Sequence, residues 1–355
     1  MKVSTANPHT QTSSLPKIVS LFCGAGGLDL GFVEEGFQIP LAVDISAAAI
    51  ETHLDNFPSS AAIAADLNAL GPTGVLEQVR KYIPKQSSIG VIGGPPCQGF
   101  SRANTRATAD DPRNKLPKLY LKIIKALQSE YSVEFVVLEN VLGIRDCKHA
   151  KTFFSVKDGL KRLGFRVDDN ELCALDFGVP QMRRRVVLIG MRKDRDYPTV
   201  VVRRQKGKRT VREAIYGLCA PAFFAPKLAK DDIPEHPNHW TMKPKSARFS
   251  NPDAMTKNTR SFKRLTWDEP SPTIAFGNRE IHVHPNGHRR LSIYEAMLIQ
   301  GFPEYFQLNG NLSQQVEQIS NAVPPPLARG IASGIRLSIV AHTEIKIESA
   351  VSEPL

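Results

Sequence analysis

The sequence lacks the features that mark membrane, secreted and disulfide-stabilised proteins. No apolar run approaches the roughly 20 residues that a membrane-spanning helix needs, and residues 1–15 have no apolar core of the kind found in a secretory signal. The five cysteines are an odd number and include no Cys-x-x-Cys pair or Cys/His cluster. Neither a disulfide scaffold nor a metal site is therefore expected, and a reducing cytoplasm fits best.

The size and composition are those of an ordinary globular protein. The 355 residues are too many for one small domain and too few for three ordinary ones, so we expect a large domain with a smaller one. Hydrophobic residues make up 41% of the chain and charged residues 23%, which argues against disorder of the whole chain.

Positive charge is concentrated in one segment. Residues 191–264 contain 18 Lys and Arg against 7 Asp and Glu, an excess equal to the net charge of +11 of the whole chain. The other 281 residues carry 28 charges of each sign. A basic segment on a neutral body predicts a polyanionic partner such as nucleic acid. A solvated basic face is the alternative.

Short apolar runs alternate with helical stretches over the first half of the chain. This alternation predicts a doubly wound α/β sheet with helices on both faces. Beyond residue 191 the alternation breaks into a basic, proline-containing segment, which predicts an inserted or separate smaller domain. Strands are expected at 17–22, 39–43, 61–65, 89–92, 135–138, 166–170 and 185–189, and helices at 28–35, 47–57, 76–82, 119–128, 153–163, 290–300 and 326–339.

A glycine-rich loop, residues 23–27, separates the first predicted strand from the first helix. Glycines there permit a tight turn and let a ligand approach the helix N-terminus, although many such turns are purely structural. Asp44 ends the next strand, where it can accept hydrogen bonds from ribose hydroxyls. Asp66 ends the third strand, where it can meet an adenine amino group or cap a helix. Because the spacing is not GxGxxG and Asp29 suits no pyrophosphate, S-adenosylmethionine is favoured over a dinucleotide.

Cys97 and Glu139 are the candidates for chemistry. Cys97 follows Pro95 and Pro96 at the end of a predicted strand, where ligands of open α/β sheets bind. The polar, basic stretch after Cys97 provides the surroundings that a reactive thiolate needs. Glu139 ends the fifth predicted strand, where a carboxyl group kept protonated in a cleft can donate to a ring nitrogen. An ordinary strand-terminal acid is the alternative for Glu139.

Two arginines accompany these groups on the last predicted strand of the first half. Arg183 and Arg185 share one face, because residues two apart on a strand point the same way. On the pocket side they can bind a carbonyl oxygen or a phosphate, and a solvated strand edge is the alternative. Asn321 stands just before a proline-initiated helix, where turn chemistry alone also explains it.

Six motifs occur along the chain in a fixed order. They are LFCGAGG (21–27), GPPCQGFS (94–101), ENV (139–141), QMRRR (181–185), RLSIYEA (290–296) with GFP (301–303), and QISNAV (318–323). In this order they resemble the motifs of bacterial DNA cytosine-5 methyltransferases of the restriction-modification type. The resemblance spans residues 18 to about 339, and the combination of the Pro-Pro-Cys-Gln, glutamate and arginine motifs is highly specific. It implies a Rossmann-like, S-adenosylmethionine-dependent methyltransferase sheet with a smaller inserted target-recognition domain.

The resemblance implies a role for each matching residue. Cys97 is the nucleophile and Glu139 the acid, while Arg183 and Arg185 help to hold the target base. Asp44 departs from the family, which usually has Glu at this ribose contact. The residues expected to bind S-adenosyl-L-methionine are Phe22, Gly24, Gly26, Asp44, Ile45, Asp66, Leu67, Pro95, Asn321 and Val323.

The implied reaction is methylation of cytosine at C5. Cys97 adds to C6 while Glu139 protonates or hydrogen-bonds N3, which makes C5 enamine-like. After C5 has taken the methyl group, loss of the C5 proton and of the thiolate restores the aromatic base. A thiol cannot reach C6 inside a stacked duplex, so the cytosine must be flipped out.

Contacts to DNA are expected from two regions. The polar stretch 101–117 is expected to be a lid over the flipped base, with Ser101, Arg102 and Arg106 as phosphate contacts. In the basic segment, the candidate base readers are Arg203, Arg204, Lys208 and Arg209.

The resemblance also implies a domain organisation and partners. A catalytic and cofactor-binding domain is expected over 17–190 and again over 289–343, with the target-recognition domain at 191–288 between them. A disordered tail is expected at 1–16 and a polar tail at 344–355. The expected partner is double-stranded DNA, and a cognate restriction endonuclease would act on the same site without needing to touch the protein. A monomer in the bacterial cytoplasm, associated with the nucleoid and not with a membrane, is expected.

Three other functions compete with this interpretation. A tRNA cytosine-5 methyltransferase would use the same motifs, but the large basic segment favours DNA, because reading a duplex sequence needs a dedicated reader. A catalytically silent DNA-binding protein is disfavoured by the intact Cys97 and Glu139. An oxidoreductase that binds NAD is disfavoured by the glycine spacing.

Overall fold

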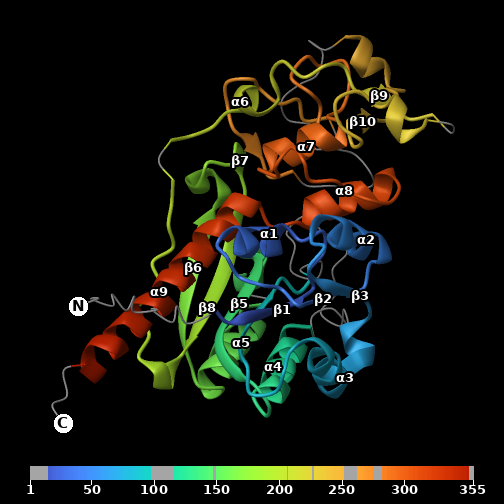
Figure 1. Cartoon of the computed structure of the whole chain (residues 1–355). Coiled ribbons are helices and arrows are strands. Elements are labelled where there is room, and N and C mark those ends of the chain that lie inside the picture. Colours follow the sequence, from blue (N-terminus) through green and yellow to red (C-terminus); the bar gives the residue numbers. More distant parts are fainter. Residues whose placement is uncertain are drawn as a thin grey trace, which may run out of the picture.

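The structure is a computed structural model that describes residues 15–96, 116–146, 149–205, 207–225, 228–251, 262–274 and 282–351. These residues form a sheet with helices on both faces and a smaller unit of short elements stacked on one end of it (Figure 1). The larger unit contains the strand ends at which the site is predicted, and the smaller unit contains most of the basic segment.

A seven-stranded mixed sheet is the centre of the larger unit, with the strand order β3-β2-β1-β4-β5-β8-β6. The strands from β3 to β5 pair in parallel, whereas β8 runs antiparallel to both β5 and β6. The predicted doubly wound α/β fold is thereby confirmed. The strands are β1 (Lys17–Leu21), β2 (Leu41–Asp44), β3 (Ala61–Ala64), β4 (Ser88–Gly93), β5 (Ser132–Val141), β6 (Phe165–Cys173) and β8 (Arg184–Arg192).

Helices cover both faces of this sheet. One buried apolar cluster joins α3, α4 and α5 to one face, and a second joins α1 and α9 to the other. Strands buried on both faces are continuous apolar runs, which explains why β4 and β5 stand out in the sequence. The helices are α1 (Gly27–Glu34), α2 (Ala47–Asn56), α3 (Leu67–Tyr82), α4 (Leu116–Leu127), α5 (Ala150–Arg162) and α9 (Pro325–Val351), with 3-10 helices at Leu142–Arg145, Ala174–Phe177 and Lys193–Arg195.

The smaller unit packs on α1 and α2 through a third apolar cluster, in which Leu30 and Phe57 meet Met297 and Ile319. Its two short sheets are β9 with β10, and β11 with β7 of the larger unit. Its elements are α6 (Val211–Ile215), β9 (Ala222–Phe223), β10 (Trp240–Thr241), β11 (Ser271–Pro272), α7 (Ile293–Ile299) and α8 (Leu312–Asn321), with β7 at Gln181–Met182 and 3-10 helices at Lys230–Asp232 and Ala247–Ser250.

The chain leaves the larger unit later than the sequence suggests. The boundary predicted at Met191 falls inside β8, and Tyr197 and Val200 still belong to the buried cluster beneath α9. The backbone N–H of Gln205 donates to the carbonyl of Asp176, so the chain is bound to the larger unit up to this point. The smaller unit therefore begins beyond residue 205.

The helices depart most from the prediction at α3, α8 and α9. α3 begins at Leu67 instead of residue 76, because Gly71 at φ 60° and Pro72 interrupt its pattern. α8 was not predicted, since it buries polar side chains that obscure its apolar stripe, including Gln315 and Gln318. α9 continues through residues 344–351, where a polar tail was predicted.

α9 is 27 residues long and lies along the sheet (Figure 1). Its exposed side carries Arg329 and Arg336, which both pair with Glu35 at 3.2 Å. Within the described ranges, no helix combines the length and apolar character needed to cross a bilayer.

Close packing of α1 on α9 leads to a stability prediction. A Cβ added at Gly31 would overlap the backbone nitrogen of Arg329, whereas one added at Gly74 in α3 would meet Leu70 at an ordinary 3.4 Å. Overpacking typically costs about 1–3 kcal/mol, and Gly→Ala inside a helix otherwise gains roughly 0.5–1 kcal/mol. We expect Gly31→Ala to lower the free energy of unfolding and Gly74→Ala to leave it equal or higher. Equal losses in urea denaturation would contradict this packing.

Candidate active site

The carboxyl ends of the parallel strands bring the predicted site together. The pairing register places Phe22, Asp44, Gly94 and Glu139 in one row at this edge, because each directly follows a residue of an aligned set across β1, β2, β4 and β5. Since β8 runs antiparallel to β5, its first residues, including Arg185, return to the same edge. Ligands of open α/β sheets bind at this edge.

Asp44 holds the glycine-rich loop. Its Oδ2 accepts a hydrogen bond from the N–H of Gly24 and its Oδ1 accepts one from the N–H of Ser46, both at 2.9 Å. Gly24 and Gly26 have φ of 53° and 86°, and the non-glycine Phe22 has φ of 56°, a strained conformation that is typical of functional sites. Burial raises the pKa of Asp44, and the backbone hydrogen bonds oppose this effect. A carboxylate has further lone pairs, so Asp44 can also accept from a ligand hydroxyl.

Asp29, the third residue of α1, is turned into the protein. It is fully buried, where it accepts a hydrogen bond from Ser20 and contacts His53. His53 was not singled out from the sequence, because nothing in the local pattern of α2 indicates that this side chain meets Asp29.

Glu139 is enclosed at the end of β5. Its Oε1 lies 2.8 Å from Nε of Arg185, and a Cβ added at Gly94 would lie 3.2 Å from its Oε2. Burial raises the pKa of Glu139, while the positive charges of Arg185 and Arg183 oppose that rise. Burial therefore favours the protonated carboxyl group, whereas the two arginines favour the carboxylate.

Asn140 connects Glu139 to the turn that precedes Cys97. Its Nδ2 donates to the carbonyl oxygen of Pro95 (3.1 Å), and Asn140 itself is buried. The end of β5 and the Pro-Pro turn after β4 are therefore held together by a buried hydrogen bond. Cys97 itself lies outside the described residues.

Arg183 and Arg185 have different partners. Both are buried while Arg184 is exposed, as the predicted alternation requires. Arg185 pairs with Glu139, whereas Nη2 of Arg183 donates to the carbonyl of Ser320 near the end of α8 (2.8 Å). Arg183 therefore links the strand of the site to the segment that contains Asn321.

A buried amide pair strengthens the same link. Gln181 donates through Nε2 to Oε1 of Gln300 (3.2 Å), and Nε2 of Gln300 donates to the carbonyls of Ile319 (2.7 Å) and Ala322 (2.8 Å). Both glutamines are fully buried. Gln300 was missed in the sequence analysis, although it directly precedes the GFP motif at 301–303.

The other predicted cofactor residues differ in their surroundings. Asp66 caps α3 by accepting from the N–H of Asn68 (2.8 Å), and its side chain is exposed. Ile45 is 69% exposed beside Asp44, which is unusual for an apolar side chain. Asn321 is exposed at the end of α8, while Leu67 and Val323 are buried.

The residues predicted to contact DNA fall into two groups. Ser101, Arg102 and Arg106 lie outside the described residues, as does nearly all of the stretch predicted as a lid. Arg203 and Arg204 run along the larger unit, where the N–H of Arg203 donates to the carbonyl of Gly330 and Arg204 pairs with Asp176 at 3.6 Å. Further along, Lys208 and Arg209 are exposed before α6.

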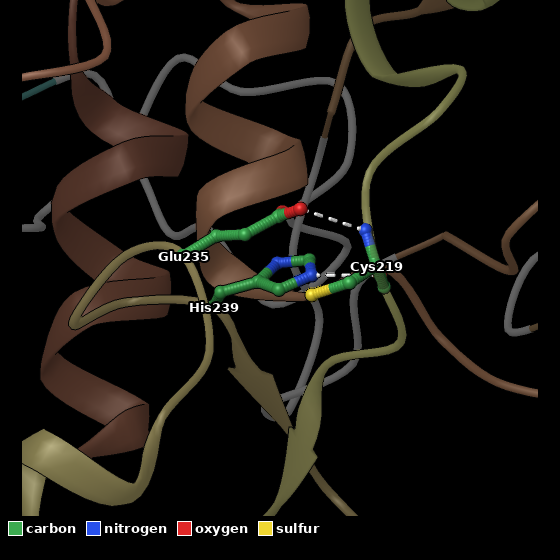
Figure 2. Close-up of side chains that lie close together, drawn as sticks. All are labelled: Cys219, Glu235 and His239. Carbon is green, nitrogen blue, oxygen red and sulfur yellow. Dashed lines mark hydrogen bonds between the residues drawn. The ribbon is translucent and has the colours of Figure 1, made fainter.

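The smaller unit contains a cluster that spacing along the chain did not predict. Figure 2 shows Cys219, Glu235 and His239, whose Sγ, carboxylate and ring nitrogen atoms lie within 4.8 Å of one another. Glu235 accepts from the N–H of Cys219 (3.1 Å), and the two ring nitrogens of His239 contact the carbonyl of Cys219 (3.0 Å) and Oγ of Ser292 (2.9 Å). Because both ring nitrogens are engaged, the cluster acts as a hydrogen-bonded link between β10 and the start of α7.

A mixed sheet of this order, with a glycine loop after β1 and a buried carboxyl group on β5, defines an α/β methyltransferase. Residues 16–336 match the family described as C-5 cytosine-specific DNA methylase. The chain belongs to this family, whose members depend on S-adenosyl-L-methionine, and it is a DNA cytosine-5 methyltransferase.

Similar proteins cover nearly the whole chain. The type II methyltransferase M1.HphI of Haemophilus parahaemolyticus is 34% identical over 89% of this chain and 86% of its own length. M.NgoPII of Neisseria gonorrhoeae is 30% identical over 94% of this chain and 99% of its own. A solved structure of a putative DNA modification methyltransferase from an Escherichia coli prophage is 25% identical, with a TM-score of 0.75 over 92% of this chain and 99% of that one. A Spodoptera frugiperda DNMT2, 17% identical with a TM-score of 0.62 over 92% and 100%, shares the fold.

Proposed function

We propose that this protein methylates C5 of one cytosine within a specific duplex DNA sequence, through a covalent adduct of Cys97. We propose further that it is the modification enzyme of a type II restriction-modification system, acting in the bacterial cytoplasm beside an endonuclease of the same specificity. The observation that carries the chemistry is the buried Glu139, which pairs with Arg185 and lies beside Gly94, where the chain turns toward Cys97.

The edge of the sheet suits S-adenosyl-L-methionine. Asp44 has lone pairs left for ribose hydroxyls, and the exposed Ile45 offers an apolar surface for adenine. The space beside Gly24 is open, since a Cβ added there would meet no described atom within 4 Å. When bound, this cofactor supplies an electrophilic methyl group on a sulfonium. The full set proposed to hold it is Phe22, Gly24, Gly26, Asp44, Ile45, Asp66, Leu67, Pro95, Asn321 and Val323.

Glu139 and Cys97 would together activate C5 of cytosine for methylation. The thiolate of Cys97 adds to C6 of cytosine, and Glu139 donates its proton or a hydrogen bond to N3, so that the electron pair is delivered to C5. Arg185 keeps Glu139 oriented, and Arg183 and Arg185 can bind the carbonyl oxygen of the base. After methylation, loss of the C5 proton and then of the thiolate restores aromaticity. Such access requires a flipped base.

The part of the smaller unit that precedes α7, residues 207–288, is proposed to read the target sequence. The basic segment carries the whole net charge of the chain, and phosphate contacts supply most of the affinity for a duplex. Lys208 and Arg209, exposed where the chain enters this unit, remain candidates for contacts to DNA. Arg203 and Arg204 are weaker candidates as base readers, because they accompany the larger unit.

Substrate class can be tested directly. Transfer of labelled methyl groups to duplex DNA and to tRNA should be measured side by side, followed by bisulfite sequencing of DNA from cells that express the protein. We expect methylation of DNA at one recurrent sequence. Transfer to tRNA alone would favour the tRNA enzyme, and no transfer to either, with DNA binding retained, would indicate a silent DNA-binding protein.

Covalent chemistry predicts a trapped adduct. DNA with 5-fluorocytosine at the target position should remain bound to Cys97, because fluorine cannot leave as a proton does. Cys97→Ser should abolish both the adduct and turnover while DNA binding persists. Cys173→Ser, which changes a half-buried cysteine at the end of β6, is the control and should retain both. Mass spectrometry that locates the adduct on another cysteine would refute the assignment.

The raised pKa of Glu139 predicts a pH profile. The protonated carboxyl is the active form, so turnover should fall as pH rises through that pKa. Glu139→Gln should lower kcat by about 10²–10⁴-fold, remove this descending limb and leave donor affinity nearly unchanged. Glu134→Gln is the matched control, since Glu134 is buried in the same strand about 16 Å away at 3.3 Å per residue. Wild-type rates in Glu139→Gln would exclude the proposed role.

Separate units for reading and chemistry predict transferable specificity. Transplanting residues 207–288 into a relative that methylates a different sequence should transfer the target sequence of the present protein. The cut beyond residue 205 preserves the packing of Tyr197 and Val200 in the larger unit. The site should be determined by bisulfite sequencing. A folded, active chimera that still methylates the relative's own sequence would show that these residues do not read DNA.

A further inference from the structure

A buried contact between a carboxyl group and an imidazole lies next to the glycine-rich loop. Oδ2 of Asp29 is 2.8 Å from Nε2 of His53, and Oδ1 of Asp29 accepts from Oγ of Ser20 at 2.7 Å. The side chains of Asp29 and His53 are both 0% exposed. A carboxylate buried to this degree is costly unless it is hydrogen-bonded and paired, so Asp29 depends on both partners.

The same histidine touches the loop through its ring. His53 packs on Phe57 with ring centroids 4.4 Å apart. A Cβ added at Gly26 would overlap the Phe57 ring and lie 3.2 Å from Cδ2 of His53, so the loop rests directly on both rings. The shape of the loop at Gly26 is therefore set by the side chains of His53 in α2 and of Phe57, the C-terminal cap of α2.

α2 holds the loop at both of its ends. At its N-terminus, Ser46 caps the helix and Asp44, two residues earlier, binds the N–H of Gly24. Near its C-terminus, His53 binds Asp29 on the other side of the loop. The segment from Asp44 to the end of α2 is thus bonded to the loop at Gly24 and to α1 at Asp29, just after the loop.

The outer side of α2 is fixed as well. Oγ1 of Thr52 accepts from the N–H of Asn309 (2.8 Å), and Asn56 exchanges hydrogen bonds with the backbone of Gln307. These contacts hold the back of α2 against the segment before α8. Without the Asp29–His53 contact, the loop-facing side of α2 would lose the hydrogen bond that joins it to α1.

Asp29 affects the pKa values of two residues near the loop. Burial is the largest cause of the raised pKa of the Cys23 thiol, and Asp29 is the second. Asp29 also makes a smaller contribution to the pKa of Asp44, which is raised mainly by burial. Asp29 is therefore electrostatically coupled to the residues at the beginning of the loop and at the end of β2.

We propose that Asp29 and His53 are positioning residues for the methyl donor, which keep the loop at residues 23–27 in its binding shape by fixing α2 against it. The inference rests on the proposed use of S-adenosyl-L-methionine. It differs from a purely structural role of the pair, which would lower the stability of the fold without a selective effect on donor binding.

The test compares Asp29→Asn, His53→Leu and His53→Gln with wild type. Glu134→Gln is the control, because Glu134 is also a buried carboxylate that accepts from a serine and from a second side chain, Ser132 and Tyr197, at the far end of β5. Affinities for S-adenosyl-L-methionine and S-adenosyl-L-homocysteine should be measured by calorimetry at a temperature at which circular dichroism shows every variant folded. Turnover at saturating donor and affinity for DNA complete the set.

We expect Asp29→Asn and His53→Leu to weaken the binding of both cofactor forms by about 10- to 100-fold, the usual effect of losing a hydrogen bond to a charged group. Turnover at saturating donor and DNA affinity should stay within about threefold of wild type. His53→Gln keeps an N–H in place of Nε2 and should recover most of the affinity. Glu134→Gln should bind the donor as wild type does.

Either of two results would overturn this inference but leave the proposed function standing. One is wild-type donor affinity in both Asp29→Asn and His53→Leu, with only the melting temperature lowered. The other is a loss of turnover at saturating donor without a change of donor affinity. A wild-type protein that binds no S-adenosyl-L-methionine would instead overturn the proposed function together with this inference.

Discussion

The alignment of the parallel strands is the constraint on which the site depends. β1, β2, β4 and β5 end at one edge because they run in parallel and in matched register. A shift of one residue in any pair would turn that strand's side chains to the opposite face. Glu139 could then no longer face Gly94 and Arg185. The apolar clusters on both faces, which fix this register, are therefore as necessary to the chemistry as the polar groups themselves.

Buried hydrogen bonds transmit this order to segments far away in the chain. Asn140 holds the Pro-Pro turn, Arg183 reaches Ser320, and Gln300 joins the chain before β8 to the end of α8. In a low-dielectric interior each such bond is strong, and leaving a partner unsatisfied is expensive. The positions of the strand ends and of α8 are consequently coupled, and α2 extends the coupling to the glycine loop. A site built in this way is preorganised before any substrate arrives.

Much of the fold and part of the site follow from local patterns in the chain. Apolar runs predicted the strands of the central sheet, because strands buried on both faces leave a signal that needs no knowledge of their neighbours. Asp44 and Glu139 were predicted as site residues for the same reason, since each directly follows such a run. The excess of basic residues in one segment was also plain from counting. α8 escaped prediction because its buried glutamines are satisfied by partners far away in the sequence.

By itself, the sequence determined the family, the candidate residues for the chemistry, the order of the strands along the chain and the segment that holds the positive charge. Only the tertiary structure decided the partners of Asp29, Arg183 and Gln300, because each partner lies on a different element and depends on how the elements pack. It also decided that β8 runs antiparallel to β5 and that the chain leaves the larger unit beyond residue 205 and not at Met191. Local periodicity records which side of an element is buried, whereas the identity of what covers that side is a property of the whole fold.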